Sequence, residues 1–285
     1  MLCYAVVNKT SAMKVLERPG WRWLAAAGAS AAETWAARRP TIVQPLPGGV
    51  FLHRHTDGVI VLPQSLSRRT PRRQRAATRD IFCFEYTPRL GDTVLDIGAG
   101  CGEEAVTFSQ LVGPAGRVIC IEGHPATYQR LALACELNDL HNVEPLHLAV
   151  ADRETTVMMD DGTPGSGSIS AAISGRGCSE VRALTIDRVI SHYNCSRIDL
   201  LKMNIEGAEQ LAVRGMSNSA HMIRHVVISC HDFLLGPEST EADRAWFGTY
   251  ETVTRFLRDM GFRLAARRPT DRRPEIPFYV YASRY

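Results

Sequence analysis

Residues 93–122 contain the types and spacing that could bind a nucleoside. The stretch T-V-L-D-I-G-A-G-C-G ends an apolar run at Asp96 and continues into a glycine-rich turn that closes at Gly102. Glycine lets backbone pass close to a ligand, and a helix start offers unpaired N–H groups. A second apolar run ends in Glu122, 20 residues after Gly102. A nucleotide fold places the acid that binds ribose hydroxyls at about this distance, so the two segments together predict a nucleoside site.

The glycine spacing and the charges after it separate two kinds of ligand. The turn reads G-x-G-x-G, whereas a dinucleotide fold uses G-x-G-x-x-G and seats a pyrophosphate on the helix N-terminus. Glu103 and Glu104 open the helix expected over Glu103–Val112, and two carboxylates there would repel a pyrophosphate. They are compatible with a cationic ligand such as the sulfonium of S-adenosylmethionine. The alternative is a tight strand–helix turn that binds no ligand. The presence of Glu122 at the position of a ribose-binding acid favours a ligand site over this alternative.

Polar residues also interrupt two later apolar runs at their C-terminal ends. They are Lys202, Asn204, Glu206, His231 and Asp232. Polar groups in such places are costly unless they are used. A histidine with a pKa near ~6.5 can accept the proton of an alcohol at neutral pH, so His231 is the candidate base. Asp232 or Glu206 could orient its ring, and a structural histidine is the alternative.

A metal-assisted reaction is the second interpretation of these residues. Its ligands would be Asn204, Glu206, His231 and Asp232. A divalent cation there would lower the pKa of an alcohol. Asn204 brings no charge, so we favour the metal-free reaction and assign no metal ligands. We expect Lys202 to pair with a carboxylate inside its strand, and Glu209 to be a structural residue of a first helical turn.

The elements that must position these residues alternate along the chain from Asp80 onward. The apolar strands expected are Thr93–Ile97, Val118–Ile121, Val143–Val150, Ile198–Met203 and Val226–Cys230. The helices expected between and after them include Ala126–Leu137, Gly207–Arg214 and Thr249–Met260. Phe262–Ala265 and Phe278–Tyr281 suit a closing antiparallel pair. The alternation predicts a mostly parallel sheet with helices on both faces, in which ligands bind beyond the carboxyl ends of the strands.

Two further segments are expected to be irregular. Residues 160–177 are rich in Gly and Ser, which predicts a mobile loop at the active site. The basic run of residues 67–75, S-R-R-T-P-R-R-Q-R, could bind phosphate groups, but such runs are more often solvated linkers. We therefore expect a boundary here, with an extension over residues 1–79 and the main domain over residues 80–285.

The extension has its own small elements. A helix is expected over Trp21–Ala37, with three tryptophans that pack on the same domain or on a second subunit. Residues 50–63 read as a hairpin that turns at Asp57-Gly58 and carries two structural histidines, His53 and His55. The extension is thus an α+β unit that could serve as a substrate lid or as the contact of a homodimer.

Composition narrows the class of protein. The chain has 285 residues, of which 45% are apolar, enough for a real core. A net charge of +3 is too small to indicate nucleic acid binding. The eight cysteines form no C-x-x-C pair, which argues against structural zinc and favours a reducing, cytoplasmic compartment. No apolar run has the length of a transmembrane segment, and the first residues lack the features of a secretory signal.

Three segments, D-T-V-L-D-I-G-A-G, L-L-K-M-N-I-E-G-A-E and S-C-H-D, together resemble the FkbM-type family of S-adenosylmethionine-dependent methyltransferases. The segment A-L-T-I-D-R-V also resembles the family pattern, and the similarity runs from about Asp80 to the C-terminus. The resemblance implies a class I methyltransferase (Rossmann-like) fold with seven strands, of which the last is antiparallel. It also implies methyl transfer, usually to a hydroxyl of a sugar or a secondary metabolite.

The resemblance also implies roles for individual residues. Those expected to bind the cofactor, S-adenosylmethionine, are Asp96, Gly98, Ala99, Gly100 and Gly102 around its methionine part, Glu122, Gly123 and His124 at its ribose, Ala149 and Val150 at its adenine, and Asn204. Those expected to be catalytic are Asn204, Glu206, His231 and Asp232. The family commonly has an aspartate in place of Asn204, so a metal or base role there is weakened. The glycine-rich turn also departs from the family pattern, because Cys101-Gly102-Glu103 stands where the family more usually has an Asn-x-Gly type of continuation.

Three rival functions remain open at this level. An NAD(P)-dependent oxidoreductase needs a turn that accepts pyrophosphate, which Glu103 and Glu104 oppose. An RNA methyltransferase would use Arg68 to Arg75 as a phosphate clamp. A non-catalytic nucleoside-binding module would bind S-adenosylmethionine without turnover. The residues do not identify the acceptor, which we expect to be a small molecule or a glycan.

Overall fold

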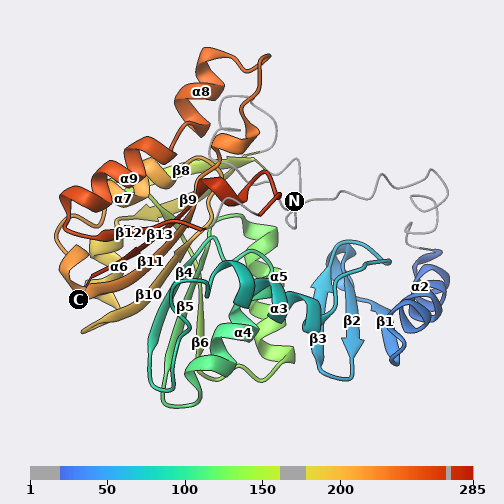
Figure 1. Ribbon diagram of the computed structural model, residues 1–285. Helices are drawn as coiled ribbons and strands as arrows, with labels where there is room; N and C mark the ends of the chain where they lie inside the picture. Colours follow the sequence, from blue (N-terminus) through green and yellow to red (C-terminus); the bar gives the residue numbers. More distant parts are fainter. Residues whose placement is uncertain (1–19, 161–177, 268–270, 285) are drawn as a thin grey trace.

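The computed structural model describes residues 20–160, 178–267 and 271–284. A small N-terminal unit lies beside a larger α/β unit (Figure 1). The larger unit is built on a seven-stranded sheet in the order β12-β13-β11-β10-β4-β5-β6. Its strands are β4 (Thr93–Ile97), β5 (Arg117–Glu122), β6 (Val143–His147), β10 (Ile198–Met203), β11 (Ile223–Ser229), β12 (Arg263–Ala265) and β13 (Tyr279–Ser283).

Strand direction in this sheet confirms the expected class I methyltransferase fold. Five neighbouring strands, β11, β10, β4, β5 and β6, run parallel to one another. The last strand of the chain, β13, is antiparallel to both of its neighbours, β11 and β12. The glycine-rich turn follows β4, an interior strand that lies between β10 and β5. In a sheet of this kind the carboxyl ends of the central strands form the ligand site.

The core follows from the alternation of side chains along each strand. Leu95 and Ile97 of β4 face one apolar cluster, and Val94 faces another on the opposite side of the sheet. In the same way Leu201 and Leu200 of β10 belong to different clusters. Successive strand residues point to opposite faces, so strands with apolar side chains on both faces require cover on both sides.

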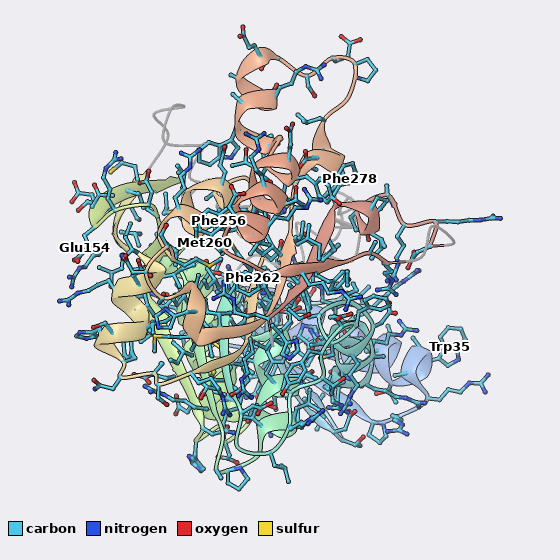
Figure 2. All side chains as sticks on the ribbon, turned by 60° about the vertical axis from the view of Figure 1, so that its left-hand side comes forward. Trp35, Glu154, Phe256, Met260, Phe262 and Phe278 are labelled. Atoms are coloured by element: carbon cyan, nitrogen blue, oxygen red, sulfur yellow. The ribbon has the colours of Figure 1, made fainter. Side chains whose placement is uncertain are left out.

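Helices supply that cover. One face is packed by α3 (Pro71–Ile81), α4 (Glu103–Val112) and α5 (Pro125–Leu137), and the other by α6 (Ile186–His192), α7 (Glu209–Arg214) and α9 (Tyr250–Asp259) (Figure 1). Phe256, Met260 and Phe262 lie together where α9 meets the sheet (Figure 2). None of the helices in the described ranges has the length and apolar character needed to cross a membrane.

The strand expected over Val143–Val150 is wrong as a single element. After β6 the chain leaves the main sheet at Leu148, and β7 (Ala149–Val150) pairs instead with β9 (Cys178–Leu184), which also pairs with β8 (Thr155–Asp160). The first part of this apolar run belongs to the main sheet and the last part to a second sheet. Hydropathy alone does not show where one strand ends and the next begins. Of the loop expected over residues 160–177, residues 161–177 lie outside the described residues.

The N-terminal unit packs α2 (Arg22–Ala37) against a three-stranded sheet of β1 (Thr41–Pro45), β2 (Phe51–His55) and β3 (Gly58–Leu62). Its alanines, not its tryptophans, form the contact: Ala26 and Ala29 are buried with Val43 and Phe51. Trp21, Trp23 and Trp35 are 52%, 64% and 84% exposed, so the expected packing of these tryptophans on their own domain is wrong. Trp35 extends away from the helix (Figure 2).

The hairpin of the N-terminal unit is shifted by one residue from its expected turn. His55 pairs with Gly58, so Thr56 and Asp57 form the turn and Gly58 begins β3. His53 is structural, as expected: its ring is buried, with Nδ1 at 3.1 Å from the Glu33 carboxylate and Nε2 at 2.9 Å from the Gln64 carbonyl oxygen.

The basic run is not a solvated linker. It continues into α3, where the Thr70 hydroxyl accepts a hydrogen bond from the Arg73 amide and Pro71 occupies the first turn. A threonine cap followed by proline is a helix start, and this local signal overrides the repulsion among the arginines. The helix α3 also runs through the boundary expected between residues 79 and 80.

Candidate active site

The carboxyl ends of β4 and β10 touch at Gly98. Gly98 has φ +74°, and a Cβ there would collide with the carbonyl oxygen of Asn204. The Asn204 amide donates to the Ile97 carbonyl at 3.0 Å, and the Gly98 amide donates to the Ile121 carbonyl at 2.8 Å. Glycine is the residue that permits both the positive φ and the close approach. The turn therefore connects β10 to β5 at the ligand end of the sheet.

A buried ion pair supports this turn from below. Lys202 Nζ lies 2.7 Å from Asp96 Oδ1 and donates to the Gly98 carbonyl at 2.8 Å. Both side chains are almost completely buried. The expected pairing of Lys202 with a carboxylate is confirmed, and that carboxylate is Asp96. The side chain of Asp96, which we expected in the cofactor site, thus lies beneath the turn rather than in the pocket.

A pocket opens beyond the ends of β4, β5 and β10. It brings together most of the residues expected to bind the cofactor, namely Gly98, Gly100, Glu122, Gly123, His124, Ala149, Val150 and Asn204. Ala99 and Gly102 are buried outside its lining: Gly102 begins α4 and faces Leu131. Of the residues expected to be catalytic, Asn204 and Glu206 line the pocket, whereas His231 and Asp232 do not.

Glu122 is held by the backbone on both sides of the pocket. Its carboxylate accepts hydrogen bonds from the Gly100 amide at 3.0 Å and from the His124 amide at 2.8 Å. Burial raises the pKa of Glu122 to about 7, although these two hydrogen bonds act in the opposite direction. The carboxyl group is thus fixed in place with an oxygen-rich face that suits the two hydroxyls of a ribose.

His124 has a structural role besides its place in the pocket. It precedes α5, and its Nδ1 accepts a hydrogen bond from the Thr127 amide at 3.3 Å. The ring is buried and its orientation is fixed by the start of the helix.

The lining is strongly acidic. Glu103, Glu104, Glu122 and Glu206 contribute carboxyl groups. Burial raises the pKa of Glu104 and that of Glu206. A desolvated carboxylate is stabilised by a nearby positive charge, so the pocket fits a ligand that carries cations. This fit agrees with a sulfonium and disagrees with a pyrophosphate.

The ring of His231 is oriented by a different carboxylate from the two expected. His231 Nδ1 donates to Glu209 Oε1 at 2.8 Å, and both side chains are buried. Glu209 also accepts hydrogen bonds from the Gly207 amide and the Thr249 hydroxyl. Since Nδ1 carries the proton, Nε2 holds the lone pair of the neutral ring. The expectation that Asp232 or Glu206 orients His231 is therefore wrong.

Asp232 instead caps a helix. Its Oδ2 accepts hydrogen bonds from the amides of Thr249 and Tyr250 at 3.1 and 3.0 Å, where α9 begins. Helix starts leave such amides unpaired, and a carboxylate there also complements the helix dipole. This position explains a polar residue at the end of β11 without a catalytic role.

Glu206 connects the pocket to the His231–Glu209 pair. It lines the pocket, and the charges of both His231 and Glu209 act on its pKa, His231 lowering it and Glu209 raising it. Its backbone has φ +52°, a strained value for a residue with a side chain. The Trp246 indole of α8 (Glu241–Phe247) donates to the Glu206 carbonyl at 3.0 Å and leaves no space for a Cβ at Gly207. Trp246 of α8 thus holds this turn over the site.

Among residues 20–160, 178–267 and 271–284, no group of three His, Cys, Asp or Glu side chains is arranged to hold a metal ion. The metal-assisted interpretation would have to rely on Asn204 and on Asp232, which already caps α9.

Sequence analysis did not identify several pocket residues. They are Arg69, Cys101, Glu103, Glu104, Thr127, Leu148, Met159 and Ile205. Glu103 and Glu104 could have been included, because their charge was already the reason to exclude a pyrophosphate. Arg69 carried no signal, since it lies in a basic run far from the glycine turn.

Comparison with protein families identifies the family of the chain. The family described as the methyltransferase FkbM domain matches residues 96–264, more than half of the chain. This range begins at the end of β4 and ends within β12, so it contains the turn, the pocket lining except for Arg69, and the His231–Glu209 pair.

Comparisons with individual proteins are more partial. Protein-L-isoaspartate O-methyltransferase 2 of Archaeoglobus fulgidus is 38% identical over 64 residues, which are 22% of this chain and 29% of that protein. Arsenite methyltransferase of Halobacterium salinarum is 36% identical over 76 residues, 25% of this chain and 19% of that protein. The chain thus spans less than a third of the length of these curated relatives.

Solved structures resemble the chain at low identity. The methyltransferase FkbM of Methylobacillus flagellatus has a TM-score of 0.48 at 16% identity, covering 75% of this chain and 50% of that one. The fibrillarin of Aeropyrum pernix, solved with bound S-adenosyl-L-methionine, has a TM-score of 0.44 at 15% identity, with 86% and 99% covered.

Proposed function

The chain belongs to the FkbM methyltransferase family, and from this premise we propose that it transfers the methyl group of S-adenosylmethionine to a hydroxyl of a small molecule or glycan. The observation that carries the proposal is the pocket beyond β4, β5 and β10. It combines a glycine turn, the carboxyl group of Glu122 held by two backbone amides, and further buried carboxyl groups that suit a sulfonium.

We assign the parts of the cofactor to the pocket as follows. Glu122 accepts hydrogen bonds from the ribose hydroxyls, and Ala149 and Val150 flank the adenine. The methionine end lies along Gly98 and Gly100, where the absence of side chains leaves room. S-adenosylmethionine supplies an activated methyl group, so alignment of the acceptor is the main task of the protein.

An alcohol attacks well only when its proton has an acceptor. We assign this role to Nε2 of His231, because Nδ1 is committed to Glu209. Glu209 stabilises the imidazolium that would form, as a buried carboxylate next to a histidine does. Glu206 lines the pocket and interacts electrostatically with both His231 and Glu209. We assign to Glu206 the binding of the acceptor next to the methyl group.

The first test is calorimetry with S-adenosylmethionine, S-adenosylhomocysteine and NAD in parallel. We expect the first two to bind and NAD not to bind. Binding of NAD alone would replace the proposal with an oxidoreductase. The second test is transfer of label from methyl-labelled S-adenosylmethionine to a panel of sugars and hydroxylated metabolites. We expect a product that survives mild alkali, since methyl ethers are stable there and methyl esters are not.

Two outcomes of the transfer assay would contradict a hydroxyl acceptor. Alkali-labile label would indicate a carboxylate as the acceptor, and label in added RNA would indicate an RNA methyltransferase. The RNA outcome would be accompanied by RNA binding that weakens steeply with salt. The structure gives little support to that outcome, because two arginines of the basic run, Arg69 and Arg75, are already paired with Glu103 and Asp57.

A further inference from the structure

Arg69 reaches the pocket from outside the part of the chain that matches the family. The match begins at residue 96, and Arg69 lies in the segment between β3 and α3. Its side chain lines the pocket and is 33% exposed. Its guanidinium pairs with Glu103, the first residue of α4. The segment before the sheet therefore contributes a charge to a site that otherwise belongs to the sheet.

The position of Arg69 is fixed by contacts on both sides of it. The amide of Arg69 donates to the Ser67 hydroxyl at 3.0 Å, and the Ser67 amide donates to the buried Glu33 at 2.7 Å. On its other side Thr70 caps α3. A side chain that begins from such a fixed backbone is suited to bind one group in one place.

The whole N-terminal unit is also joined to the helices beside the pocket. The Asn138 side chain, at the end of α5, accepts from the Val59 amide at 2.9 Å and donates to the Val59 carbonyl at 3.0 Å. Arg75 of α3 pairs with Asp57 in the hairpin turn. These contacts connect β3, α3 and α5, so they hold the segment that carries Arg69 against the elements of the pocket.

The balance of charge in the pocket shows what Arg69 can bind. Four carboxyl groups line the described pocket, and Arg69 supplies its one guanidinium. The cofactor has two cations, the sulfonium and the amino group, and one anion, the α-carboxylate. The carboxyl groups suit the cations, but they repel the α-carboxylate. In the described lining the guanidinium is the group that compensates for this repulsion.

The position of Arg69 agrees with the amino-acid end of the ligand. Its guanidinium lies at the start of α4, where it pairs with Glu103. Glu122 and Val150, which we assign to the nucleoside, lie on the β5 and β7 side of the pocket.

We propose that Arg69, presented by the N-terminal unit, binds the α-carboxylate of S-adenosylmethionine beside the start of α4. The inference rests on the proposed function, because it concerns the same pocket. A guanidinium has five N–H donors in a planar fork, so Arg69 can bind the ligand carboxylate while it keeps its contact with Glu103. The N-terminal unit is then part of the cofactor site.

The test compares two ligands that differ only in the amino-acid end. S-adenosylhomocysteine carries the carboxylate, and 5′-methylthioadenosine lacks the whole amino-acid end. We expect Arg69→Gln to weaken S-adenosylhomocysteine by about 10- to 100-fold in calorimetry, the range of a hydrogen bond to a charged group. Binding of 5′-methylthioadenosine should change by less than about threefold. Arg69→Lys should fall between wild type and Arg69→Gln, since it keeps the charge but not the fork.

Arg72→Gln is the matched control, because Arg72 belongs to the same basic run but is exposed on α3. It should change neither affinity. Equal weakening of both ligands by Arg69→Gln would mean that Arg69 only shapes the pocket, and unchanged affinities would mean that it does not bind the ligand; either result overturns the inference. Failure of the wild type to bind both ligands would instead overturn the proposed function itself.

Discussion

The acidic residues of the pocket show how burial and hydrogen bonding compete at one side chain. Glu122 accepts two backbone hydrogen bonds that stabilise its ionised form, yet burial prevails and raises its pKa to about 7. Because the folded-state pKa lies above the ordinary value, the protonated form stabilises the fold. That contribution is complete below the ordinary pKa and is lost as the pH rises through about 7.

This shift makes cofactor affinity depend on pH. Ribose hydroxyls donate to the ionised carboxylate, so binding should be strongest above pH 7. We expect the affinity for S-adenosylhomocysteine to fall by about tenfold from pH 8 to pH 6, the change in ionised fraction for a group with this pKa. Calorimetry across this range measures it. Glu122→Gln should bind more weakly throughout and without the pH dependence; a dependence that persists in this variant would assign it to another group.

His231 has the geometry of an oriented base, with Nδ1 fixed by Glu209. We predict that His231→Ala lowers turnover by ~10²-fold while leaving the affinity for S-adenosylhomocysteine unchanged. The measurement is the rate of label transfer to an accepted substrate. His221→Ala is the control, since His221 is an exposed histidine in the short helical turn before β11, at the opposite end of that strand from His231. Near-normal turnover in His231→Ala would leave His231 with a purely structural role.

At the scale of elements, the site depends on turns held by their neighbours. The turn after β10 has positive φ at both Glu206 and Gly207, and the indole of Trp246 in α8 bonds to it. No residue of α8 itself is buried. The helix thus depends on contacts such as this one for its position, and it fixes a strained turn that lines the pocket.

We predict that Trp246→Phe, which keeps an aromatic ring but removes the donor, lowers turnover by about fivefold. The loss corresponds to one neutral hydrogen bond of about 1 kcal/mol. Label-transfer kinetics with an accepted substrate measure the effect. Trp35→Phe makes the same chemical change on α2, where Trp35 is largely exposed, and should have no effect. If the two variants behave alike, α8 does not control the turn.

At the scale of the whole molecule, the N-terminal unit and the sheet both contribute residues to the lining of one pocket. Asn138 makes two hydrogen bonds to Val59 across the junction, and Arg69 extends from the same unit into the pocket. The helix α2 packs against its own sheet through its alanines, and its tryptophans are exposed. A role of this unit as a dimer contact or substrate lid stays a prediction.

Loss of the Asn138–Val59 hydrogen bonds should both loosen the N-terminal unit and weaken cofactor binding. We predict that Asn138→Ala costs about 1–2 kcal/mol of stability, because it leaves the Val59 amide and carbonyl without these partners. Limited proteolysis should then cut the N-terminal unit faster, and affinity for S-adenosylhomocysteine should fall more than that for 5′-methylthioadenosine. Asn218→Ala, at an exposed asparagine bonded to Asp187, is the control for affinity. Unchanged proteolysis in Asn138→Ala would show that other contacts hold the junction.

The sequence by itself determined what is encoded locally. Strand and helix periodicity predicted the central sheet, and the glycine spacing with Glu122 predicted where its ligand lies. Glu103 and Glu104, adjacent to the turn, indicated the charge of that ligand. Each of these signals lies within one element or between two consecutive ones, where residue spacing translates directly into geometry.

Tertiary structure alone decided the pairings between distant segments. Glu209, not Asp232 or Glu206, orients His231; Asp232 caps α9; Asp96 supports the turn through Lys202; and Arg69 enters the pocket. The short run Ala149–Val150 leaves the main sheet for β9. Such outcomes depend on which elements pack side by side and how closely. Because hydropathy and charge at a single position are compatible with many partners, packing selects among them.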